Sequence, residues 1–204
     1  MLNALDILVE NVPGLDLNQK SPIEINWTRK ELATFFHLCA FKIGAEIGIE
    51  RAVYSRCLLE QNPDLFLYMI DPWMNYAGYR DHVSREKFEE MYVESVQQVK
   101  PFSHQIIRQT SVQASTLITN GSLDFVYIDG NHDFLNVTQD LHYWTPKVKT
   151  GGVIAGHDFT RRKGNYINHV KDVIQAWTYS HGIKPWFVCK GDKSPSWFWI
   201  KTKG

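Results

Sequence analysis

The stretch from Leu123 to His132 reads LDFVYIDGNH. Its first six residues form an almost continuous apolar run, as expected of a β-strand that is covered on both faces in a parallel sheet. The run stops at Asp129, and only Gly130 and Asn131 separate this acid from His132. The stretch therefore predicts a buried central strand that delivers a carboxylate and an imidazole to one edge of a sheet.

On both sides of this strand, short apolar runs alternate with segments of helical periodicity. Such alternation is typical of an α/β fold, in which right-handed helical crossovers connect parallel strands. The predicted strands cover residues 44–49, 65–70, 104–108, 123–128 and 153–155. The predicted helices cover residues 51–60, 88–99, 112–118, 134–144 and 170–177. Residues 186–189 and 197–200 are predicted to form a closing hairpin at the sheet edge.

The N-terminal part of the chain precedes this alternating pattern. Thr28 and Glu31 have the spacing of a capping box, and apolar residues follow at helical spacing, so a leading helix is predicted over residues 28–40. Residues 1–27 contain two prolines and one glycine and are predicted to form an irregular arm. The length of 204 residues predicts a single domain over residues 1–204.

The charge of the chain is balanced, with 22 Lys and Arg residues against 22 Asp and Glu residues. This balance argues against nucleic-acid binding, which needs a clustered basic surface. The sequence has neither a basic leader followed by an apolar run nor a stretch of about 20 apolar residues, so neither export nor a membrane span is predicted. Three cysteines without CxxC spacing give no disulfide framework or zinc ribbon, and they favour a reducing compartment, the cytoplasm.

The turn from Glu46 to Arg51 follows the first predicted strand, at the edge where an open α/β sheet binds its ligands. It contains a single glycine, Gly48, where a dinucleotide-binding turn has three. Glu50 would repel a pyrophosphate, so the turn suits a cationic ligand, with Glu46 beside an ammonium group. Asp71 follows the next strand, where an acid can accept both hydroxyl protons of a ribose. Together these acids favour an adenosine with a cationic tail, and the structural alternative is that they cap helices or pair with arginines.

Asp129 and Asp158 end two apolar runs that a single helical crossover connects. Right-handed crossovers place such strands side by side, about 4.8 Å apart, so that the two carboxylates can share one cation. Oxygen ligands and water suit Mg²⁺, whereas binding by His132 or His157 favours Mn²⁺, Fe²⁺ or Zn²⁺. His132 is also the predicted general base, because imidazole titrates near neutral pH. The alternative for His157 is a structural role as the cap of the loop that follows it.

Four segments, at residues 44–49, 70–73, 123–132 and 151–159, together resemble the motifs of class I S-adenosylmethionine-dependent methyltransferases. They are most similar to the small-molecule O-methyltransferase subgroup, which carries Ile-Asp-Gly-x-His after the fourth strand and Gly-Gly-x-Ile-x-Gly-His-Asp around the fifth. The resemblance extends over residues 41–180. It implies a Rossmann-like, three-layer α/β/α sandwich whose seven-stranded, mostly parallel sheet has the order 3-2-1-4-5-7-6 and an antiparallel C-terminal strand.

The same resemblance implies roles for individual residues. The predicted S-adenosylmethionine contacts are Glu46 and Gly48 at the methionine end, Asp71 at the ribose and Ser111 at the adenine, together with Ile49, Trp73 and Asp129. Similarity to macrocin-type sugar O-methyltransferases implies a divalent ion, Mg²⁺ or Mn²⁺, bound by Asp129, His157 and Asp158.

The predicted function is transfer of a methyl group from S-adenosylmethionine to a hydroxyl of a small molecule, with His132 and Asp129 as catalytic residues. A sugar is a candidate acceptor, and a divalent metal is a candidate for assisting the methyl transfer. Two alternatives remain open: a metal-dependent hydrolase that uses the Asp and His cluster without the cofactor, and a non-catalytic module that only binds the cofactor. The single-glycine turn disfavours a nicotinamide dehydrogenase.

Two flanking segments are predicted to cover the site as a substrate lid. One is the aromatic loop with Trp73, Tyr76 and Tyr79, and the other is the basic run at residues 161–163. Aromatic faces suit a sugar or a planar ring, and the basic run suits a carboxylate or a phosphate. The alternatives are a hydrophobic cover for the cofactor and a solvated basic loop. A homo-oligomer is the candidate assembly.

Overall fold

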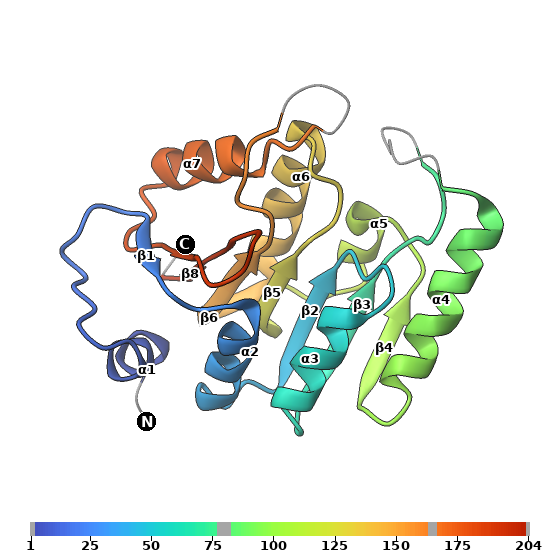
Figure 1. Ribbon diagram of the computed structural model, residues 1–204, viewed down its shortest axis with the longest axis horizontal. Helices are drawn as coiled ribbons and strands as arrows, with labels where there is room; N and C mark the ends of the chain where they lie inside the picture. Colours follow the sequence, from blue (N-terminus) through green and yellow to red (C-terminus); the bar gives the residue numbers. More distant parts are fainter. Residues whose placement is uncertain (1–2, 77–82, 163–166, 203–204) are drawn as a thin grey trace.

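The computed structural model describes residues 3–76, 83–162 and 167–202 (Figure 1). Within these residues, eight strands form one sheet in the order β1-β7-β8-β6-β5-β2-β3-β4. The strands are β1 (Ile23–Ile25), β2 (Ile43–Ile47), β3 (Phe66–Ile70), β4 (His104–Ile107), β5 (Leu123–Ile128), β6 (Val148–Gly156), β7 (Phe187–Cys189) and β8 (Ser196–Ile200). The helices are α1 (Ala4–Asn11), α2 (Arg29–Leu38), α3 (Val53–Gln61), α4 (Arg85–Val99), α5 (Ser111–Ser115), α6 (Phe134–Trp144), the short 3-10 helix η1 (Thr145–Lys147) and α7 (Val170–Ser180).

Strand β5 is the central strand that the apolar run predicts, and all six of its residues are buried. It pairs in parallel with β2 on one side and with β6 on the other. The two registers align Ile47 of β2, Ile128 of β5 and Gly156 of β6. The loops that follow these three strands therefore begin at one level, along one edge of the sheet.

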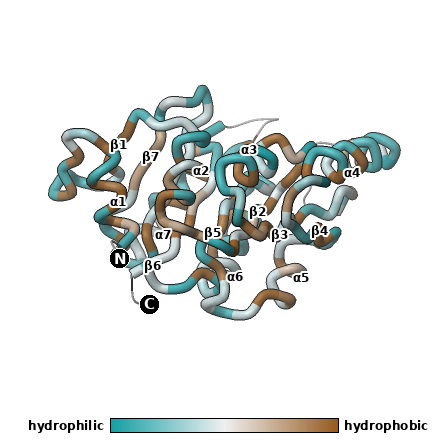
Figure 2. Tube along the Cα trace, turned by 90° about the horizontal axis from the view of Figure 1, so that it is seen from below, coloured by the Kyte–Doolittle hydropathy of each residue, from teal (hydrophilic) through white to brown (hydrophobic). Residues whose placement is uncertain are grey.

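Helices cover both faces of the sheet, which confirms the three-layer α/β/α sandwich. Phe125 and Tyr127 of β5 belong to an apolar cluster with residues of α1 to α4, whereas Val126 and Ile128 belong to a second cluster with residues of α5 to α7. This division follows from the alternation of side chains along a strand. Figure 2 shows the same layers, with α2, α3 and α4 on one side of the strands and α5 and α6 on the other.

Seven of the strands have the expected order, since β4-β3-β2-β5-β6-β8-β7 corresponds to 3-2-1-4-5-7-6. Strand β8 is antiparallel to both of its neighbours, β6 and β7, as expected of the C-terminal strand. The predicted number of strands is one too low, because β1 pairs in parallel with β7 and becomes the eighth.

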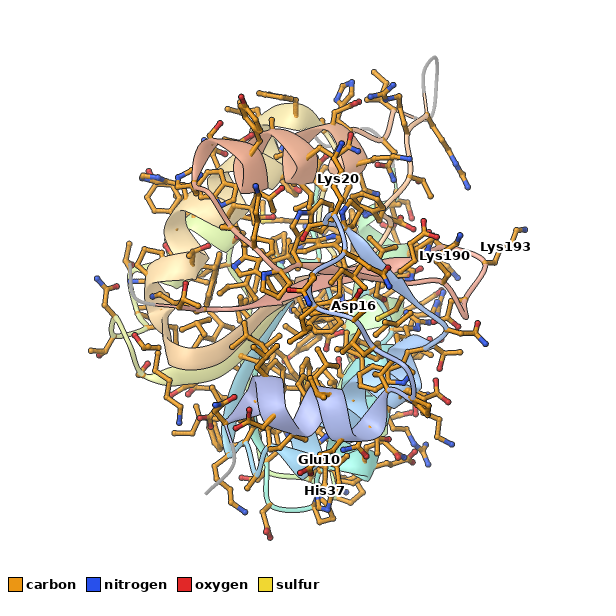
Figure 3. All side chains as sticks on the ribbon, turned by 90° about the vertical axis from the view of Figure 1, so that its left-hand side faces the viewer. Glu10, Asp16, Lys20, His37, Lys190 and Lys193 are labelled. Atoms are coloured by element: carbon orange, nitrogen blue, oxygen red, sulfur yellow. The ribbon has the colours of Figure 1, made fainter. Side chains whose placement is uncertain are left out.

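The prediction of an irregular arm over residues 1–27 is wrong for α1 and β1. Helix α1 begins with a capping box. In β1, Ile23 and Ile25 are buried, and the exposed Glu24 between them lies 2.8 Å from Nζ of Lys190, which Figure 3 shows beside this strand. A strand of three residues depends on pairing with its neighbour, so the short alternation Ile-Glu-Ile is a weak signal in the sequence.

Two other elements show how far the boundaries could be predicted. The leading helix is confirmed, since Thr28 is the N-cap of α2 and forms a capping box with Glu31. The strand predicted at residues 153–155 is longer, because β6 begins at Val148. Gly151 and Gly152, which precede the predicted strand, lie within β6 at a shift in its register against β5. Such an irregularity adds residues to a strand without ending it.

Two expectations from composition concern the cysteines and the membrane. All three cysteines are unpaired, with Cys39 and Cys57 half-buried and Cys189 buried. Burial raises the pKa of the Cys39 thiol to about 12, which keeps it in the unreactive thiol form. Across the described ranges, no helix combines the length and the apolar character that a membrane span requires.

Candidate functional site

The candidate site lies at the carboxyl ends of four strands that are neighbours in the sheet, β6, β5, β2 and β3. In an open parallel sheet, this edge is where ligands bind. It carries Asp129 and His132 after β5, His157 and Asp158 after β6, and Asp71 after β3. The structure thus assembles along one edge the side chains that the sequence places after successive strands.

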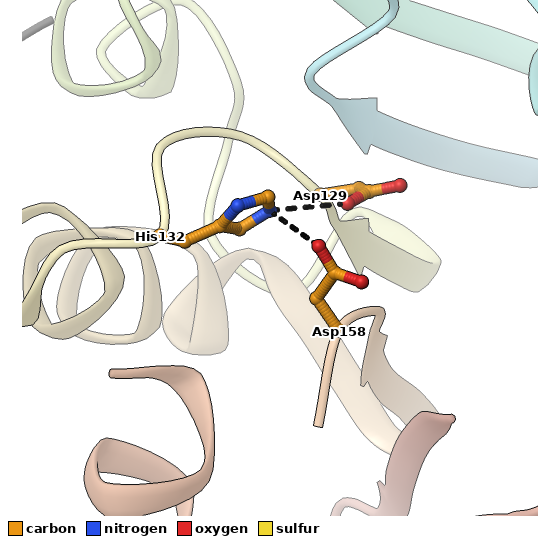
Figure 4. A group of neighbouring side chains, drawn as sticks. All are labelled: Asp129, His132 and Asp158. Atoms are coloured by element: carbon orange, nitrogen blue, oxygen red, sulfur yellow. Dashed lines mark hydrogen bonds and ion pairs between the residues drawn. The ribbon is translucent and has the colours of Figure 1, made fainter. Parts of the chain in front are cut away.

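Asp129, His132 and Asp158 form a compact cluster (Figure 4). Nε2 of His132 lies 3.4 Å from Oδ1 of Asp129 and 3.3 Å from Oδ2 of Asp158. His157 contacts the same acids, with Nδ1 at 3.6 Å from Oδ2 of Asp129 and 3.4 Å from Oδ1 of Asp158. The side chain of His132 is 33% exposed and that of His157 is 14% exposed, so His132 is the more accessible imidazole.

Hydrogen bonds from the backbone and from neighbouring side chains fix the positions of Asp129 and Asp158. The N–H of Asp129 donates to the carbonyl of Ile47 at 2.8 Å, which extends the β5–β2 pairing beyond the strand. Asp158 has a φ of +53°, a left-handed conformation that costs a residue with a Cβ about 1–2 kcal/mol. Ser194 Oγ donates to Oδ1 of Asp158, and Nδ2 of Asn168 donates to its carbonyl at 3.3 Å. These two partners hold Asp158 in its strained conformation.

The donor atoms of the cluster also suit a metal ion. Within the ranges that the structure describes, Asp129, His132 and Asp158 offer ligand atoms that all lie within 4.8 Å of one another. The predicted ligand set contains His157, and the compact group contains His132 in its place. Two carboxylates and one imidazole are donors that fit Mn²⁺, Fe²⁺ or Zn²⁺. A metal at this cluster, and His157 as one of its ligands, stay predictions.

Glu46 lies in β2 and is only 2% exposed. Ser55 of α3 donates its hydroxyl proton to Oε2 of Glu46. Burial raises the pKa of the Glu46 carboxyl to about 8, and the nearby Asp129 carboxylate adds to this rise. A cation beside Glu46 would oppose both effects, because it favours the ionised carboxylate.

Asp71 connects the loop after β3 with the turn after β2. Its Oδ2 accepts the N–H groups of Ile49 at 2.9 Å and Glu50 at 3.1 Å, and its Oδ1 accepts that of Trp73 at 2.8 Å. Burial raises the pKa of the Asp71 carboxyl, while these hydrogen bonds lower it. A carboxylate has about four acceptor sites, so about one remains for a ribose hydroxyl, not the two that the sequence suggests.

Ile49 and Trp73, two of the predicted cofactor contacts, are buried. Nε1 of Trp73 donates to the carbonyl of Glu50 at 2.8 Å. Its ring meets Tyr92 of α4 edge to face, with 5.2 Å between the centroids. Only 2% of Trp73 is exposed, so it packs beneath the loop after β3 and does not form an open lid.

The other predicted lid residues differ in what they contact. Tyr76 hydrogen-bonds to Asn131, which brings the aromatic loop into contact with the loop after β5, and burial raises the pKa of the Tyr76 hydroxyl. Arg161 pairs with Asp172 of α7, with Nε at 2.9 Å from Oδ2. The two predicted lid residues that lie outside the described residues are Tyr79 and Lys163.

Ser111, the predicted adenine contact, begins α5 and belongs to a network of side chains. Its Oγ donates to Oδ1 of Asp140 and accepts the indole N–H of Trp144 at 2.8 Å. Asp140 is 4% exposed, and burial raises the pKa of its carboxyl to about 7. Sequence reasoning missed Asp140, although a signal is present: this acid lies three residues after Val137, on the apolar face of α6.

Gly48 lets the turn after β2 pass close to the loop after β5. Its φ is +86°, and a Cβ at this position would lie 2.1 Å from the carbonyl oxygen of Asp129. We expect Gly48→Ala to lower the free energy of unfolding by about 3 kcal/mol, since a left-handed alanine costs about 1–2 kcal/mol and overpacking about 1–3 kcal/mol. Urea denaturation followed by tryptophan fluorescence measures this loss.

Gly121→Ala is the matched control for this prediction. Gly121 also has a positive φ, +68°, but nothing lies within 4 Å of its Cβ position. This variant should lose only the conformational part, about 1–2 kcal/mol. Equal losses in the two variants would show that the close approach to Asp129 does not matter.

Comparisons with known proteins bear on this arrangement. A family described as "Methyltransferase domain" matches residues 42–159, which is more than half of the chain. The chain is also 28% identical over 146 residues to an uncharacterised protein, y4gI, of Sinorhizobium fredii. That match covers 71% of this chain and 15% of the other protein, so the chain spans a small part of its relative's length.

Solved structures share the fold. An O-methyltransferase family protein from Burkholderia thailandensis matches with a TM-score of 0.63 and 10% identity, over 86% of this chain and 56% of that chain. The N-methyltransferase NodS from Bradyrhizobium japonicum, in complex with S-adenosyl-L-homocysteine, matches with a TM-score of 0.60 and 14% identity over 86% of each chain. At these identities the similarity concerns the fold alone, and it confirms the predicted Rossmann-like class.

Proposed function

We propose that this chain, which belongs to the methyltransferase domain family, transfers the methyl group of S-adenosylmethionine to a hydroxyl oxygen of a small molecule. The observation that carries the proposal is the position of His132, whose Nε2 lies 3.4 Å from Asp129 and 3.3 Å from Asp158. An imidazole held in this way is suited to take a proton from a hydroxyl nucleophile. An amine acceptor, which attacks through a free lone pair, has less need of such a base.

The proposed cofactor site extends from β2 to α5. Glu46 would bind the ammonium group of the methionine end, because a cation compensates a buried carboxylate. Asp71 would bind a ribose hydroxyl through its remaining acceptor site, and Ser111 would lie near the adenine. The other proposed contacts are Gly48, Ile49, Trp73 and Asp129. The S-adenosyl-L-homocysteine complex of NodS, which shares this fold, supports the choice of cofactor.

In the proposed reaction, the acceptor oxygen attacks the methyl carbon in line with its bond to sulfur, from about 3–3.5 Å. A carbon–oxygen bond forms, the carbon–sulfur bond breaks with its electrons going to sulfur, and S-adenosylhomocysteine leaves. In the neutral His132 ring the proton lies on Nε2, which faces the carboxylates of Asp129 and Asp158, so the lone pair lies on Nδ1. The hydroxyl proton moves to Nδ1 and from there to water. Asp129 and Asp158 stabilise the imidazolium cation, because both carboxylates face Nε2.

A divalent metal is the finer part of this proposal. Asp129, His132 and Asp158 would hold it, and when bound it would lower the pKa of the acceptor hydroxyl. A metal on Nε2 uses the single lone pair of the neutral ring and leaves the proton on Nδ1, so His132 cannot serve in both roles at once. Calorimetry with Mn²⁺ separates them: binding that Asp158→Asn abolishes supports the metal, and no binding at about 1 mM assigns His132 to proton transfer.

We propose a sugar as the first acceptor class to test, in line with the resemblance to macrocin-type enzymes. Tyr76 beside Asn131 supplies an aromatic side chain near the site, and aromatic faces suit sugar rings. The three unpaired cysteines agree with action in the reducing cytoplasm. A homo-oligomer stays a prediction.

Titration calorimetry with S-adenosylhomocysteine tests the proposed function. We expect one bound molecule per chain, with a dissociation constant below about 1 mM. Asp71→Ala should weaken binding by about tenfold or more, because it removes a charged hydrogen-bond acceptor. Asp64→Ala is the control, since Asp64 is exposed and pairs with Lys42 at the opposite end of β3. No binding by the wild type at about 1 mM would overturn the proposal.

The same variants distinguish the two alternatives. Metal-dependent ester hydrolysis that survives both Glu46→Ala and Asp71→Ala would favour a hydrolase that uses the Asp and His cluster alone. Cofactor binding without methyl transfer to any screened hydroxyl compound, and with no difference between wild type and His132→Ala, would favour a non-catalytic module.

A further inference from the structure

Asn168 and His169, two consecutive residues before α7, contact both loops that carry the cluster. The N–H of His169 donates to the carbonyl of His132 at 2.9 Å, and Nδ1 of His169 accepts the N–H of Phe134 at 3.1 Å. His169 therefore hydrogen-bonds to both ends of residues 132–134, once through its backbone and once through its side chain. The rings of His169 and Phe134 also meet edge to face, with 6.5 Å between their centroids.

Asn168 makes the matching contacts with the other loop. Its Nδ2 donates to the carbonyl of Asp158 at 3.3 Å and to Oγ1 of Thr160 at 3.1 Å. Its Oδ1 accepts the N–H of Val170 at 2.9 Å, and its backbone pairs with Arg162 in both directions at 3.0 Å. Asn168 is buried, and both polar atoms of its side chain are hydrogen-bonded. Buried polar groups with all partners present hold their surroundings in one geometry.

We infer that Asn168 and His169 are positioning residues that set the distance between His132 and Asp158. The pairing of β5 with β6 ends at Ile128 and Gly156, so strand register alone does not fix side chains further along the two loops. The two residues before α7 connect these loops. The N–H of His169 binds the carbonyl of His132, and Nδ2 of Asn168 binds the carbonyl of Asp158. Those are the residues whose side chains meet at 3.3 Å. The kinetic consequence of this inference rests on the proposed function.

The Phe134 amide has a physical reason to need His169. It belongs to the first turn of α6, where N–H groups have no partner within the helix. The N-cap residue Asp133 accepts the N–H of Asn136 through its side chain. Because Nδ1 of His169 accepts the Phe134 bond, the proton of the neutral ring lies on Nε2. Asparagine presents an oxygen where histidine has Nδ1, whereas leucine presents no acceptor, and this contrast gives a matched pair of variants.

Amide hydrogen exchange tests the link without an activity assay. In His169→Leu we expect the Phe134 amide to exchange about 3- to 10-fold faster than in the wild type, the size expected for one lost hydrogen bond. His169→Asn should keep the wild-type rate. The amides of β5 are the internal reference, because a general loss of stability accelerates exchange there as well. An unchanged rate at Phe134 in His169→Leu, or an equal acceleration at Phe134 and in β5, would overturn the inference.

Kinetics of the same variants test the positioning itself. His169→Leu should lower kcat by about tenfold or more with less than about a twofold change in the dissociation constant of S-adenosylhomocysteine, since misplacing reacting groups by about 1 Å can cost 10²-fold. His169→Asn should restore most of kcat. His181→Leu is the control, because Nδ1 of His181 contacts the carbonyl of Trp177 at the far end of α7.

The two possible failures are distinct. If the wild type does not bind S-adenosylhomocysteine, the proposed function fails, and the exchange rate of the Phe134 amide still decides whether His169 holds this loop. If the cofactor binds but His169→Asn is as slow as His169→Leu, the positioning role fails and the proposed function stands.

Discussion

The Glu46→Gln variant is expected to bind S-adenosylhomocysteine about 30-fold more weakly than the wild type at pH 8.5, and about equally at pH 6. A hydrogen bond to a charged group contributes about 1.5–3 kcal/mol, which is about 10- to 150-fold in affinity. Burial raises the pKa of unliganded Glu46 to about 8, so at pH 6 this carboxyl is mostly protonated and resembles the amide. Binding a cation there requires loss of the proton, and this lowers the affinity by up to about tenfold per pH unit below pH 8.

Calorimetry from pH 6 to pH 8.5 measures the ratio of the two dissociation constants. The titration of the ligand itself cancels in this ratio, because both proteins bind the same molecule. Glu24→Gln on the exposed edge strand β1 is the control and should give a ratio of about 1 at every pH. A ratio for Glu46→Gln that does not change with pH would remove Glu46 from the ammonium site.

The stability of the unliganded protein should change in the opposite direction. Because the folded-state pKa of Glu46 is raised, its favourable contribution is complete below the unfolded pKa near 4.5 and is lost as the pH rises through about 8. Glu46→Gln has no such loss, so at pH 8.5 it should be more stable than the wild type, by a difference on the order of 4 kcal/mol. Urea denaturation at pH 5 and pH 8.5 measures this. A variant that binds weakly and is also less stable at pH 8.5 would indicate a misfolded site.

The close approach of Asp129 and Asp158 could be predicted, because the topology of the sheet decides it. Apolar runs that end at Asp129 and Asp158 define two parallel strands, and a right-handed crossover makes these strands neighbours. The parallel pairing of β5 with β6 confirms this step. The same reasoning brings Glu46 and Asp71 to one edge, since β2 and β3 pair in parallel as well. The order and direction of the strands alone decide these positions.

The partners of individual side chains could not be predicted in the same way. The resemblance to macrocin-type enzymes implies His157 as a metal ligand, whereas the loop after β5 turns so that His132 also reaches both acids. Ser111 bonds to Asp140 of α6, a contact that depends on how each helix is rotated on the sheet. Periodicity fixes which face of a helix is buried, but not which atoms meet across two helices.

His132→Gln is expected to lower kcat of methyl transfer by about 10²- to 10⁴-fold, with little change in the dissociation constant of S-adenosylhomocysteine. Glutamine keeps a polar atom near the position of Nε2, so the hydrogen bonds around Asp129 and Asp158 can persist, but an amide does not accept the proton of the acceptor hydroxyl. Formation of S-adenosylhomocysteine, followed with an acceptor found by screening, measures kcat. An equal loss of kcat and of cofactor affinity would indicate damage to the fold instead of a missing base.

His157→Asn is the matched variant, because asparagine keeps a polar atom at the position of Nδ1, the nitrogen that faces Asp129 and Asp158 at 3.6 and 3.4 Å. The backbone of His157 is held by Ile128 and by the indole of Trp197, so we expect a loss of less than about tenfold, as for the removal of one neutral hydrogen bond. A larger loss than in His132→Gln would transfer the role of base to His157. If added Mn²⁺ restores the rate of His132→Gln, the imidazole acts as a metal ligand, because mass action refills a weakened metal site but cannot replace a missing proton acceptor.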